Sequence, residues 1–494
     1  MQTFDLEPRQ ELIFKVGNEP IKLELRRGLA EVYGTEMLVN RTYTLQRKHS
    51  KAAVFTYQGA TIEMTGSPLK HHVSRNCDYM MRYLAIHRDL DAMREEAERL
   101  SEQMDFNAPS SSSGSTDNPA DSAPAQQQAP TSSAEVPNRE AGVEGERVDN
   151  DDQRPKGLRP DLSKIPICLV CEPMDAKNVG KSTLCRILLN YATRRGRAPI
   201  FVDLDPDQGQ IGLPGTIGAL SIESPIDIEM GLELKSSMLM HFGHEKPSAD
   251  IENKSSLYYN AIVESMAKVV HSKLEHDRKS YYSGVIINSS SWTEDNDYKL
   301  LVNACKAFQA NMVIVVDSEV LAVDLQKDLE AATTVLNVPK TVDIHKSSTN
   351  EHLEMRYARI GEYFYGTKQQ PFNPMNSEIK FAFLKRLIYK ISNSLMLPDS
   401  LMPLGNKTQD NQVEVSQYEC SASDLLHYML AVSYCKIDDV VDNPESVLRS
   451  NIMGFICVTS VRGDGETVNI LTPQKIPMDH VLLYSDIQYM DLLI

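Results

Sequence analysis

The tetrapeptide Gly180-Lys181-Ser182-Thr183 constrains this chain more than any other feature. It lies between an apolar run at 165–170 and apolar residues at helical spacing, Leu184, Ile187, Leu188 and Tyr191. A strand, a loop, Gly-Lys-Ser and a helix in this order form a P-loop, whose backbone N–H groups at the helix N-terminus surround phosphate. The lysine reaches the β- and γ-phosphates, and the serine hydroxyl ligates Mg²⁺. The sequence therefore predicts a nucleoside triphosphate site.

The loop before Gly180 departs from that pattern. A complete P-loop carries a glycine five positions earlier, where this chain has Asp175, and no glycine occurs from 171 to 179. Glycine at the earlier position allows a positive φ and a close approach of the backbone to phosphate. A carboxylate there repels phosphate, and Lys177 compensates only in part. We therefore expect a nucleotide-binding fold whose affinity for nucleotide is reduced.

The order of the expected elements indicates an α/β fold, with a central P-loop NTPase parallel sheet flanked by N-terminal and C-terminal β-rich domains. The chain's 494 residues are too many for one core. Residues 1–104 are typical of a β-sandwich or barrel followed by a helix, because short alternating runs and glycines precede a helical apolar face. Residues 164–375 alternate helices with apolar strands, and 376–494 return to β patterns.

The strongest strand patterns fall in the central and C-terminal segments. The stretch 425–430 fits a helix and a buried strand equally well. The expected strands of the central segment are 165–170, 199–204, 283–288 and 312–316, and those of the C-terminal segment are 379–389, 412–416, 453–460 and 467–471.

Residues 105–163 form a composition break. Within 105–155, ten acidic residues face three basic ones, and Ser, Pro, Ala and Gln dominate. Such a segment cannot bury enough apolar surface to order itself. We predict a disordered acidic linker.

Composition excludes several classes of protein. No apolar stretch reaches about 18 residues, so no membrane span is expected. The N-terminus lacks the basic and apolar regions of a secretory signal. The eight cysteines lack paired spacing, and Cys168 and Cys171 stand without a second pair, so free thiols and a reducing compartment are expected. A net charge of −17 argues against nucleic-acid binding through the whole surface.

Polar residues after the expected strands are candidates for chemistry. Asp205 follows the strand after the P-loop helix, where a carboxylate can bind Mg²⁺ through water or accept a proton from an attacking hydroxyl. It can also simply cap its loop. Asp203, within the strand, and Asp317, after the strand at 312–316, are weaker candidates. Asp317 lacks the Asn-Lys-x-Asp sequence that a GTPase requires.

Two further patterns admit both a functional and a structural reading. A basic helix holds Arg356 and Arg359, and such a helix can place arginine on transferring phosphoryl oxygens or merely face solvent. Trp292 is the only tryptophan and follows the strand at 283–288, where it can stack on a base or pack in the core.

Taken together, ordered strings along nearly the whole chain outside 105–163 resemble the eukaryotic Clp family of RNA 5′-hydroxyl kinases and pre-mRNA cleavage factor II subunits. The resemblance implies an N-terminal β domain, a central kinase domain and a C-terminal β domain. The strings are Ala30–Glu36, Gly180–Thr183, Leu204–Pro206 with Gln208-Gly209, Leu213–Leu220, His241–Gly243, Glu362–Gly366, Leu397–Ser400 and Asp486–Leu492.

The resemblance implies roles for the residues around phosphate. Lys181 would hold the β- and γ-phosphates of ATP, Ser182 would ligate Mg²⁺, and Thr183 would contact the α-phosphate region. Gly180 completes this cofactor-binding set. Asp205 would be the general base or an indirect ligand of the metal.

It also implies roles for residues farther from the P-loop. Trp292 would stack on the RNA end, and Arg356 matches the first of two lid arginines. Glu11 matches an N-terminal-domain glutamate that contacts adenine. Lys51 is a looser match, at altered spacing, to a basic residue that packs on the base.

This sequence departs from the family's motifs in three places. The loop Gly-Pro-Thr-Asp-Val-Gly is represented by Glu172-Pro173-Met174-Asp175, three extra residues at 176–178, and Val179-Gly180. The second lid arginine falls at Gly361. The segment Asn-Thr-Cys-Gly-Trp has Ser291 in place of its glycine. Loss of an arginine clamp can cost roughly 10³–10⁵ in rate in other P-loop enzymes. We therefore predict weak or absent kinase activity.

Two functions follow from the resemblance. The first is an ATP-binding nuclear subunit of the mRNA 3′-end cleavage and polyadenylation machinery, bound to the large scaffold protein of cleavage factor II. The alternative is an active ATP-dependent RNA 5′-hydroxyl kinase in mRNA 3′-end processing and tRNA splicing. In that case Lys177 and Arg359 would replace the lost groups, an RNA 5′-hydroxyl end would be the substrate, and the tRNA splicing endonuclease would be a further partner.

Overall fold

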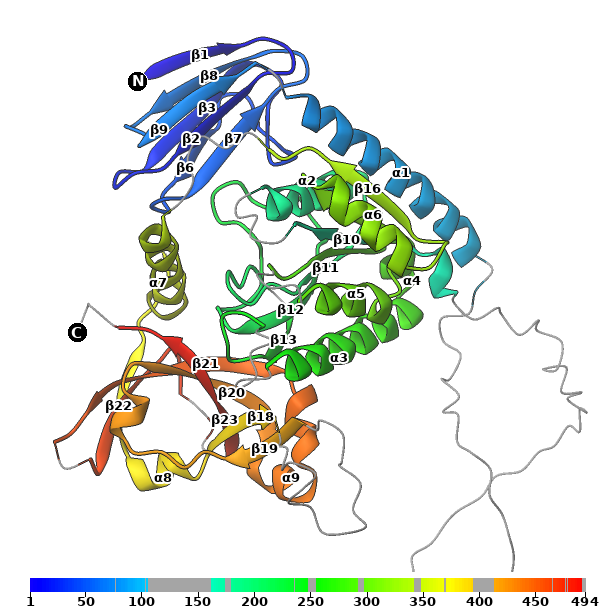
Figure 1. The fold of residues 1–494 in the computed structure, drawn as a ribbon. Helices are drawn as coiled ribbons and strands as arrows, with labels where there is room; N and C mark the ends of the chain where they lie inside the picture. The colour runs from blue at the N-terminus through cyan, green and yellow to red at the C-terminus, as the bar shows by residue number, and fades with distance from the viewer. Residues whose placement is uncertain are drawn as a thin grey trace, which may run out of the picture.

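A computed structural model gives the arrangement of the chain as three bodies, a β-sandwich, a central α/β domain and a C-terminal β-rich domain (Figure 1). This confirms the expected fold class. The acidic segment, apart from 161–163, lies outside the described residues. The structure describes residues 1–75, 77–102, 104, 161–173, 179–234, 236–247, 255–291, 297–341, 348–367, 370–393, 413–463, 465–475, 477 and 479–490.

The N-terminal body is a sandwich of two antiparallel sheets. Alternation in the sequence builds it, because Ile21, Leu23 and Leu25 are buried while Lys22 points outward. The strands are β1 (Gln2–Leu6), β2 (Glu11–Lys15), β3 (Ile21–Gly28), β4 (Glu31–Val32), β5 (Thr35–Glu36), β6 (Thr42–Leu45), β7 (Lys51–Phe55), β8 (Ala60–Thr65) and β9 (Lys70–Ser74). One sheet has the order β1-β8-β3-β6 and the other β5-β4-β7-β2-β9.

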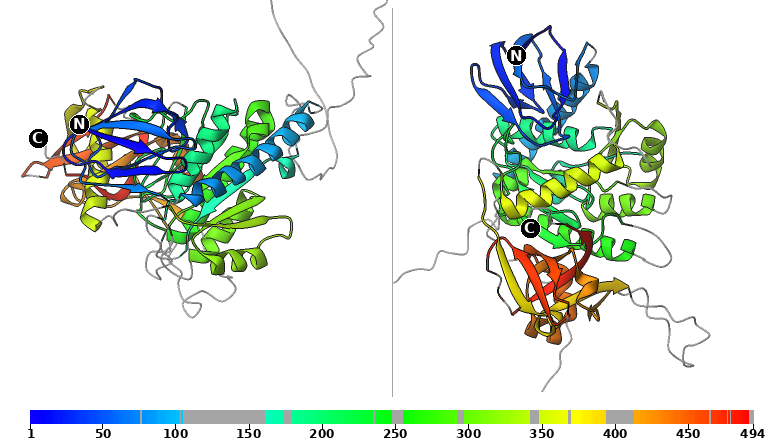
Figure 2. Two further views of the ribbon diagram at one scale, coloured as in Figure 1. Left: turned by 90° about the horizontal axis from the view of Figure 1, so that it is seen from above. Right: turned by 90° about the vertical axis from the view of Figure 1, so that its left-hand side faces the viewer.

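Helix α1 (Asp78–Ser101) leaves the sandwich and runs along the central domain (Figures 1 and 2). The predicted apolar face is the buried one, since Ile86, Leu90 and Ala97 are buried. Arg94 is also buried, and its Nε donates to the carbonyl of Ser283 at 2.9 Å. The helix thus fixes the sandwich against the central domain.

The central sheet has the order β13-β12-β11-β14-β10-β15-β16. Its strands are β10 (Ile167–Cys171), β11 (Ile200–Asp203), β12 (Thr216–Ser221), β13 (Met238–His241), β14 (Val285–Asn288), β15 (Met312–Val316) and β16 (Thr334–Val338). The expected strands are present within one or two residues. Strands β11, β14, β10, β15 and β16 are parallel, whereas β12 and β13 run antiparallel at one edge, which the sequence patterns did not indicate.

Helices cover both faces of this sheet, as buried parallel strands require. The carboxyl ends of the parallel strands meet at one edge, which is where ligands bind in open α/β sheets. The helices are α2 (Lys181–Arg194), α3 (Ser255–His276), α4 (Arg278–Ser283), α5 (Tyr298–Ala307) and α6 (Glu319–Asp328), with a short 3₁₀ turn at Leu162–Lys164.

The C-terminal body is built on one sheet of order β17-β22-β21-β20-β23-β18-β19. The stretch 425–430 joins a 3₁₀ turn to β20, and the expected strand at 379–389 is interrupted by helix α8. The elements are β17 (Met375–Lys380), α8 (Phe381–Lys385), β18 (Ile388–Asn393), β19 (Val413–Gln417), β20 (Tyr428–Lys436), α9 (Ile437–Asp442), β21 (Ile452–Val461), β22 (Thr467–Thr472) and β23 (His480–Gln488), with 3₁₀ turns at Ser423–Leu425 and Pro444–Arg449.

Helix α7 (Thr349–Tyr365) bridges the sandwich and the C-terminal body (Figure 1). Toward the sandwich, Lys15 Nζ lies 2.8 Å from Glu351 Oε1, and Lys48 Nζ lies 2.7 Å from Glu354 Oε2. Lys15 is 1% exposed, so the carboxylate of Glu351 is needed to balance a buried ammonium.

The other end of α7 holds the C-terminal body through aromatic residues. The hydroxyl of Tyr363 accepts a hydrogen bond from the backbone N–H of Phe455 at 2.8 Å. Phe364 stacks on Tyr489 with ring centroids 5.9 Å apart. Because one helix contacts both outer bodies, its position depends on both of them.

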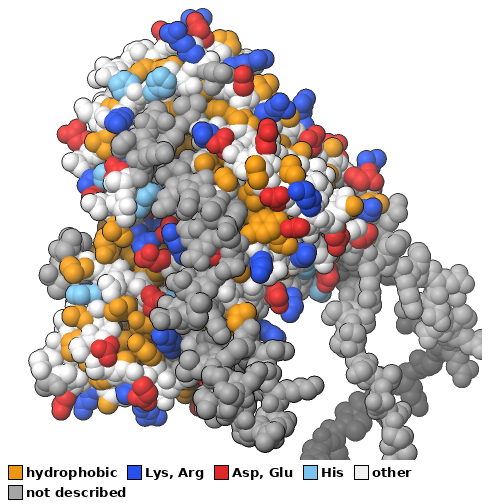
Figure 3. Space-filling model, in the orientation of Figure 1, with side chains coloured by type: hydrophobic (Ala, Val, Ile, Leu, Met, Phe, Trp, Pro, Cys, Tyr) orange, Lys and Arg blue, Asp and Glu red, His pale blue; other side chains and the backbone are white. Residues whose placement is uncertain are grey.

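The structure also bears on the expectations for the cysteines, for membrane spans and for surface charge. All eight cysteines are free, as predicted, and no helix among the described residues has the length and apolarity needed to cross a membrane. On the face drawn in Figure 3, acidic and basic side chains are interspersed over the described parts of the sandwich and central domain.

We predict that Glu351→Gln lowers the thermal stability of the protein at pH 7. The hydrogen bond from Lys15, followed by one from the backbone of Ser348, lowers the pKa of Glu351 from 4.5 to about 2. A carboxyl whose pKa is lowered by folding stabilises the folded protein at pH values above its unfolded pKa. This contribution to stability is lost as the pH falls toward the folded pKa. The difference in melting temperature between wild type and variant should therefore shrink between pH 4.5 and 2.

The matched control is Glu354→Gln, one turn along the same helix. Glu354 and Lys48 are about half exposed, so their ion pair should contribute less. Equal losses in the two variants would contradict the importance of the Lys15 pair.

Candidate phosphate-binding site

The predicted P-loop joins β10 to α2. Gly180 caps α2 with a φ of +104°, a conformation that L side chains rarely adopt. A Cβ at this position would also lie 2.6 Å from Oγ1 of Thr341, which belongs to the segment after β16. Gly180 is therefore required by both its backbone conformation and the close approach of Thr341.

Helix α2 is fixed by the sandwich as well as by its own sheet. The side-chain amide of Asn190 donates to the carbonyl of Tyr33 at 2.7 Å. The hydroxyl of Tyr191 donates to Glu31, whose carboxylate also lies 2.9 Å from Arg194. The string 30–36, noted in the sequence, thus holds the helix that carries the P-loop lysine.

Lys181 opens α2 and is buried at the carboxyl edge of the sheet. Its Nζ donates to the carbonyl of Ser289 at 2.5 Å, and lies 3.4 Å from Glu172 Oε1 and 3.7 Å from Asp205 Oδ2. Burial by itself lowers the pKa of Lys181, but the carboxylates of Glu172 and Asp205 outweigh burial and raise it. The lysine is therefore held as a cation among strand-end groups from β10, β11 and β14.

Asp205 lies beside this lysine, as expected for the strand-end acid. Burial raises its pKa to about 6, against the lowering effect of Lys181. Asp203, the last residue of β11, instead accepts hydrogen bonds from Asn288 Nδ2 at 2.7 Å and from the N–H of Gln210 at 2.8 Å. Asp203 thus organises the loop, and Asp205 is the acid placed next to Lys181.

Arg356 reaches the same loop from α7. Its guanidinium forms ion pairs with Asp207 and Glu245, and the N–H of Asp207 donates to Asp205 Oδ1 at 3.2 Å. The expected lid arginine therefore lies beside the loop that carries Asp205, and two carboxylates already engage it.

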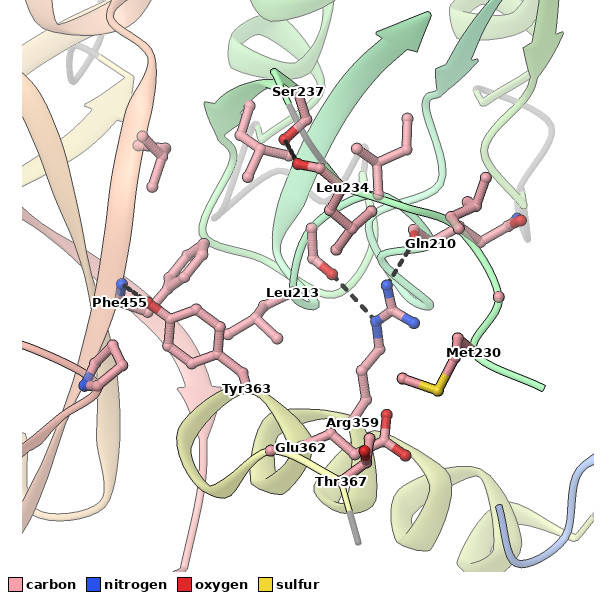
Figure 4. A pocket seen from close by; sticks show the side chains of 18 of the residues that line it. Gln210, Leu213, Met230, Leu234, Ser237, Arg359, Glu362, Tyr363, Thr367 and Phe455 are labelled. Atoms are coloured by element: carbon pink, nitrogen blue, oxygen red, sulfur yellow. Dashed lines mark hydrogen bonds between the residues drawn. The ribbon is translucent and has the colours of Figure 1, made fainter. Parts of the chain in front are cut away.

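Arg359 stabilises the loop after β11 through hydrogen bonds to its backbone, rather than facing Lys181. Its Nε donates to the carbonyl of Gly212 at 3.1 Å and a terminal nitrogen donates to that of Gln210 at 2.6 Å (Figure 4). Burial lowers the pKa of Arg359 to about 10. It lines a cavity of about 1330 Å³ between α7, the central domain and residues such as Phe455 of the C-terminal sheet.

The two residues proposed to contact the base lie apart on the sandwich. Glu11 and Lys51 belong to paired strands β2 and β7, but Glu11 is opposite Phe55 and Lys51 is opposite Lys15. Four residues of strand, about 14 Å, separate these positions. Glu11 is buried and accepts a hydrogen bond from Tyr79, and burial raises its pKa to about 7 despite that bond.

The Glu11 end of the pair approaches the P-loop. Its strand partner Phe55 belongs to the same apolar cluster as Val179 and Leu184, on either side of Gly180 and Lys181. Lys51 lies at the opposite end, where its carbonyl accepts a hydrogen bond from the hydroxyl of Tyr33 at 2.8 Å. Tyr33 in turn contacts Arg186 and Asn190 of α2, so both ends of the strand pair are linked to the P-loop helix, and the base contacts of Glu11 and Lys51 stay predictions.

Other expected residues fall into three groups. Trp292, Asp175 and Lys177 lie outside the described residues. Ser182 and Thr183 are partly exposed in the first turn of α2. The rival acid Asp317 pairs with Lys340 at 2.6 Å.

Sequence reasoning did not assign roles to the carboxylates Asp207 and Glu245. Asp207 lies between the matched strings Leu204–Pro206 and Gln208-Gly209, two residues beyond Asp205, so a local pattern could have pointed to it. Glu245 is distant from Arg356 in the chain, so only the fold shows this contact.

The chemistry of these residues fits a nucleoside triphosphate with a divalent cation. Lys181 supplies positive charge, the first turn of α2 supplies backbone N–H groups, and Ser182 and Asp205 are oxygen donors of the kind Mg²⁺ prefers. Among the residues that the structure describes, no group of three or more His, Cys, Asp or Glu could hold a metal alone. Phosphate oxygens of a nucleotide and water would complete the coordination of a bound Mg²⁺.

Comparisons with known proteins identify relatives for all three bodies. Residues 5–97 match the family model of the N-terminal beta-sandwich domain of polyadenylation factor. Residues 175–366 match the mRNA cleavage and polyadenylation factor CLP1 P-loop, and 372–491 match pre-mRNA cleavage complex II protein Clp1.

Full-length relatives agree with these matches. The chain is 34% identical over 491 residues to a CLP1 homologue of Culex quinquefasciatus, covering 99% of the chain and 97% of the relative. It is also 34% identical to the polyribonucleotide 5′-hydroxyl-kinase Clp1 of Xenopus tropicalis, covering 99% of the chain and 94% of that protein. A solved Clp1p–Pcf11p complex contains a chain with a similar fold, at a TM-score of 0.70, 17% identity and 99% and 98% coverage.

We predict that Asp205→Asn raises stability at pH 8 by roughly 3 kcal/mol, because the folded protein no longer has to bury this ionised carboxyl. The pKa of Asp205 is raised from 3.8 to about 6, so the folded wild type takes up a proton as the pH falls through 6. The gain should therefore disappear between pH 6 and 3.8 in thermal unfolding measurements.

Asp203→Asn is the matched control at the end of the same strand. Asp203 accepts from three donors, the side chain of Asn288 and the backbone N–H groups of Asp205 and Gln210, and an amide would turn its own N–H toward at least one of them, so this variant should be less stable than wild type. Destabilisation of both variants would contradict the burial cost assigned to Asp205.

Proposed function

Because the chain belongs to the Clp1 family, we propose that it is an ATP-binding subunit of the pre-mRNA 3′-end cleavage machinery with weak or lost kinase activity. The P-loop domain and the polynucleotide kinase relatives support the use of a nucleotide. The cleavage-complex family model and the Clp1p–Pcf11p structure support the assembly role.

The observation that carries the nucleotide proposal is the position of Lys181. This residue begins α2 directly after Gly180 and is flanked by Asp205 at the carboxyl edge of the parallel sheet. In this arrangement Lys181 would neutralise the β- and γ-phosphates of ATP, and Ser182 and Asp205 would hold Mg²⁺. Bound Mg²⁺ would supply charge neutralisation at the phosphates.

The proposal of reduced kinase activity rests on the carboxylates around Lys181 and Arg356. Lys181 has carboxylates of Glu172 and Asp205 within 3.7 Å, and Arg356 pairs with Asp207 and Glu245. Four acids thus surround two cations where transferring phosphate would need positive charge. The position of the second lid arginine is Gly361, which adds no charge.

The second candidate function is an active RNA 5′-hydroxyl kinase, favoured by one observation. Asp205 is buried beside Lys181, and its pKa, raised to about 6, suits a group that accepts a proton from an attacking hydroxyl. Arg356 would then leave its carboxylates to stabilise the transferring phosphate. Arg359 is not available for that role, because it braces the carbonyls of Gln210 and Gly212.

Partners and location follow from the same proposal. A protein of the Pcf11 type is the proposed cleavage factor II scaffold. If the kinase is active, an RNA 5′-hydroxyl end is the substrate and the tRNA splicing endonuclease a further partner. The proposed location is the nucleus.

The assembly proposal predicts that the full chain co-purifies with a Pcf11-type protein from its own source. The frog relative, paired with its own Pcf11-type protein, serves as the positive control in the same pull-down. Retention of the control complex together with loss of the test complex would refute the scaffold role.

The nucleotide proposal predicts that Lys181→Ala weakens the binding of ATP·Mg²⁺ at least about tenfold, since a buried cation near phosphate is lost. Calorimetry on wild type and variant measures the change, and Lys327→Ala, which removes an exposed lysine of α6, is the matched control. Phosphate transfer to a 5′-hydroxyl oligoribonucleotide should be at least about 100-fold slower than for the frog relative.

Two results would change these conclusions. Equal affinities of wild type and Lys181→Ala would remove the P-loop from nucleotide binding. Transfer at the rate of the frog relative, abolished by Lys181→Ala, would establish the active kinase instead.

A further inference from the structure

Two residues beside Lys181 are not part of a P-loop pattern, and they contact each other. Glu172 directly follows β10 and Ser291 lies beyond the end of β14. The hydroxyl of Ser291 donates to Glu172 Oε1 at 2.8 Å. Both residues stand where the sequence resemblance implies glycine, which has no side chain to make this bond. The two departures from the motif therefore form one structural feature.

This pair surrounds the ammonium of Lys181. Glu172 Oε1 lies 3.4 Å and Ser291 Oγ 3.5 Å from Nζ, and the carboxylate of Asp205 lies 3.7 Å away. Glu172 and Lys181 are about 5% exposed, so water screens their attraction little. The lysine is bound by the chain's own groups on the side where strands β10, β11 and β14 end.

The charges around Lys181 oppose the entry of phosphate. One ammonium faces two carboxylates, Glu172 and Asp205, so the cluster carries a net negative charge when both acids are ionised. To grip a phosphate, Lys181 has to exchange an existing carboxylate contact for the new one. Asp205 is part of the expected metal site, whereas Glu172 has no counterpart there.

We propose that Glu172, oriented by Ser291, restrains Lys181 and lowers the affinity of this site for nucleoside triphosphates. Glu172 acts as a positioning residue, because its effect on the nucleotide passes through the lysine. The inference rests on the proposed nucleotide site and explains how this chain would tune it. The restraint lowers the affinity for nucleotides whose phosphates reach Lys181. It leaves unchanged the affinity for nucleotides whose phosphates do not reach it.

The test is calorimetric titration of ATP·Mg²⁺ into the full-length wild type and Glu172→Gln. Glutamine keeps the size of the side chain and can still accept the Ser291 hydrogen bond, but it removes the charge. The expected result is an affinity about tenfold tighter in the variant. Ser291→Ala keeps the charge of Glu172 but removes its hydrogen bond from Ser291, so it should give a smaller gain in the same direction.

Two controls separate this mechanism from a general change in the protein. Glu330→Gln removes an exposed carboxylate near β16 and should leave ATP affinity at the wild-type value. AMP carries only the α-phosphate, so its affinity should be the same in wild type and Glu172→Gln. An equal gain for AMP would overturn the inference, because the effect would not depend on phosphates near Lys181.

The outcomes distinguish the inference from the function on which it rests. Binding by both proteins with a gain in Glu172→Gln, or binding by the variant alone, supports restraint by Glu172. Binding by both with equal or weaker affinity in the variant overturns the restraint and leaves the nucleotide site intact. Absence of ATP binding in both proteins, with unchanged melting temperatures, overturns the nucleotide site and the inference together.

Discussion

The buried ammonium of Lys181 is the interaction on which the candidate site depends. A buried cation has to be compensated, and here Glu172, Asp205 and the carbonyl of Ser289 surround it. Each of these groups follows a different parallel strand, so their meeting is a consequence of strand order. The same charges that stabilise the lysine in the folded protein compete with phosphate for it. Charge compensation of the buried lysine and affinity for nucleotide are therefore opposed at one atom.

Helix α7 links this charge cluster to the outer bodies. Lys15 of the sandwich anchors its first turn through Glu351, and Tyr363 and Phe364 join its last turn to the C-terminal sheet. Between these anchors, Arg356 and Arg359 reach the loop after β11. Since both outer bodies hold the helix, movement of Arg356 toward a substrate would involve contacts of all three bodies.

The sequence was most informative where local pattern and tertiary environment agree. Uninterrupted apolar runs marked the parallel strands, and Gly180-Lys181 marked the start of α2. It was less informative where a strand is interrupted or a residue's partner is remote. The break at α8 within 379–389 and the antiparallel edge strands have no distinct periodicity, since short apolar runs look alike in either direction. The resemblance assigns both Glu11 and Lys51 to the base, yet they lie at opposite ends of the β2–β7 pair. The pairing of strands in the sandwich sets this register.

By itself, the sequence determined the α/β class, the P-loop position, the free cysteines and the positions that depart from the family motif, because each is encoded within a few consecutive residues. Only the tertiary structure decided what those departures do. Glu172 and Ser291 are more than a hundred residues apart, and they meet because β10 and β14 are neighbours in the sheet. Arg356 likewise finds Asp207 and Glu245 through the placement of α7. Which charged residues pair with each other depends on their distances in space, and no local pattern in the chain contains those distances.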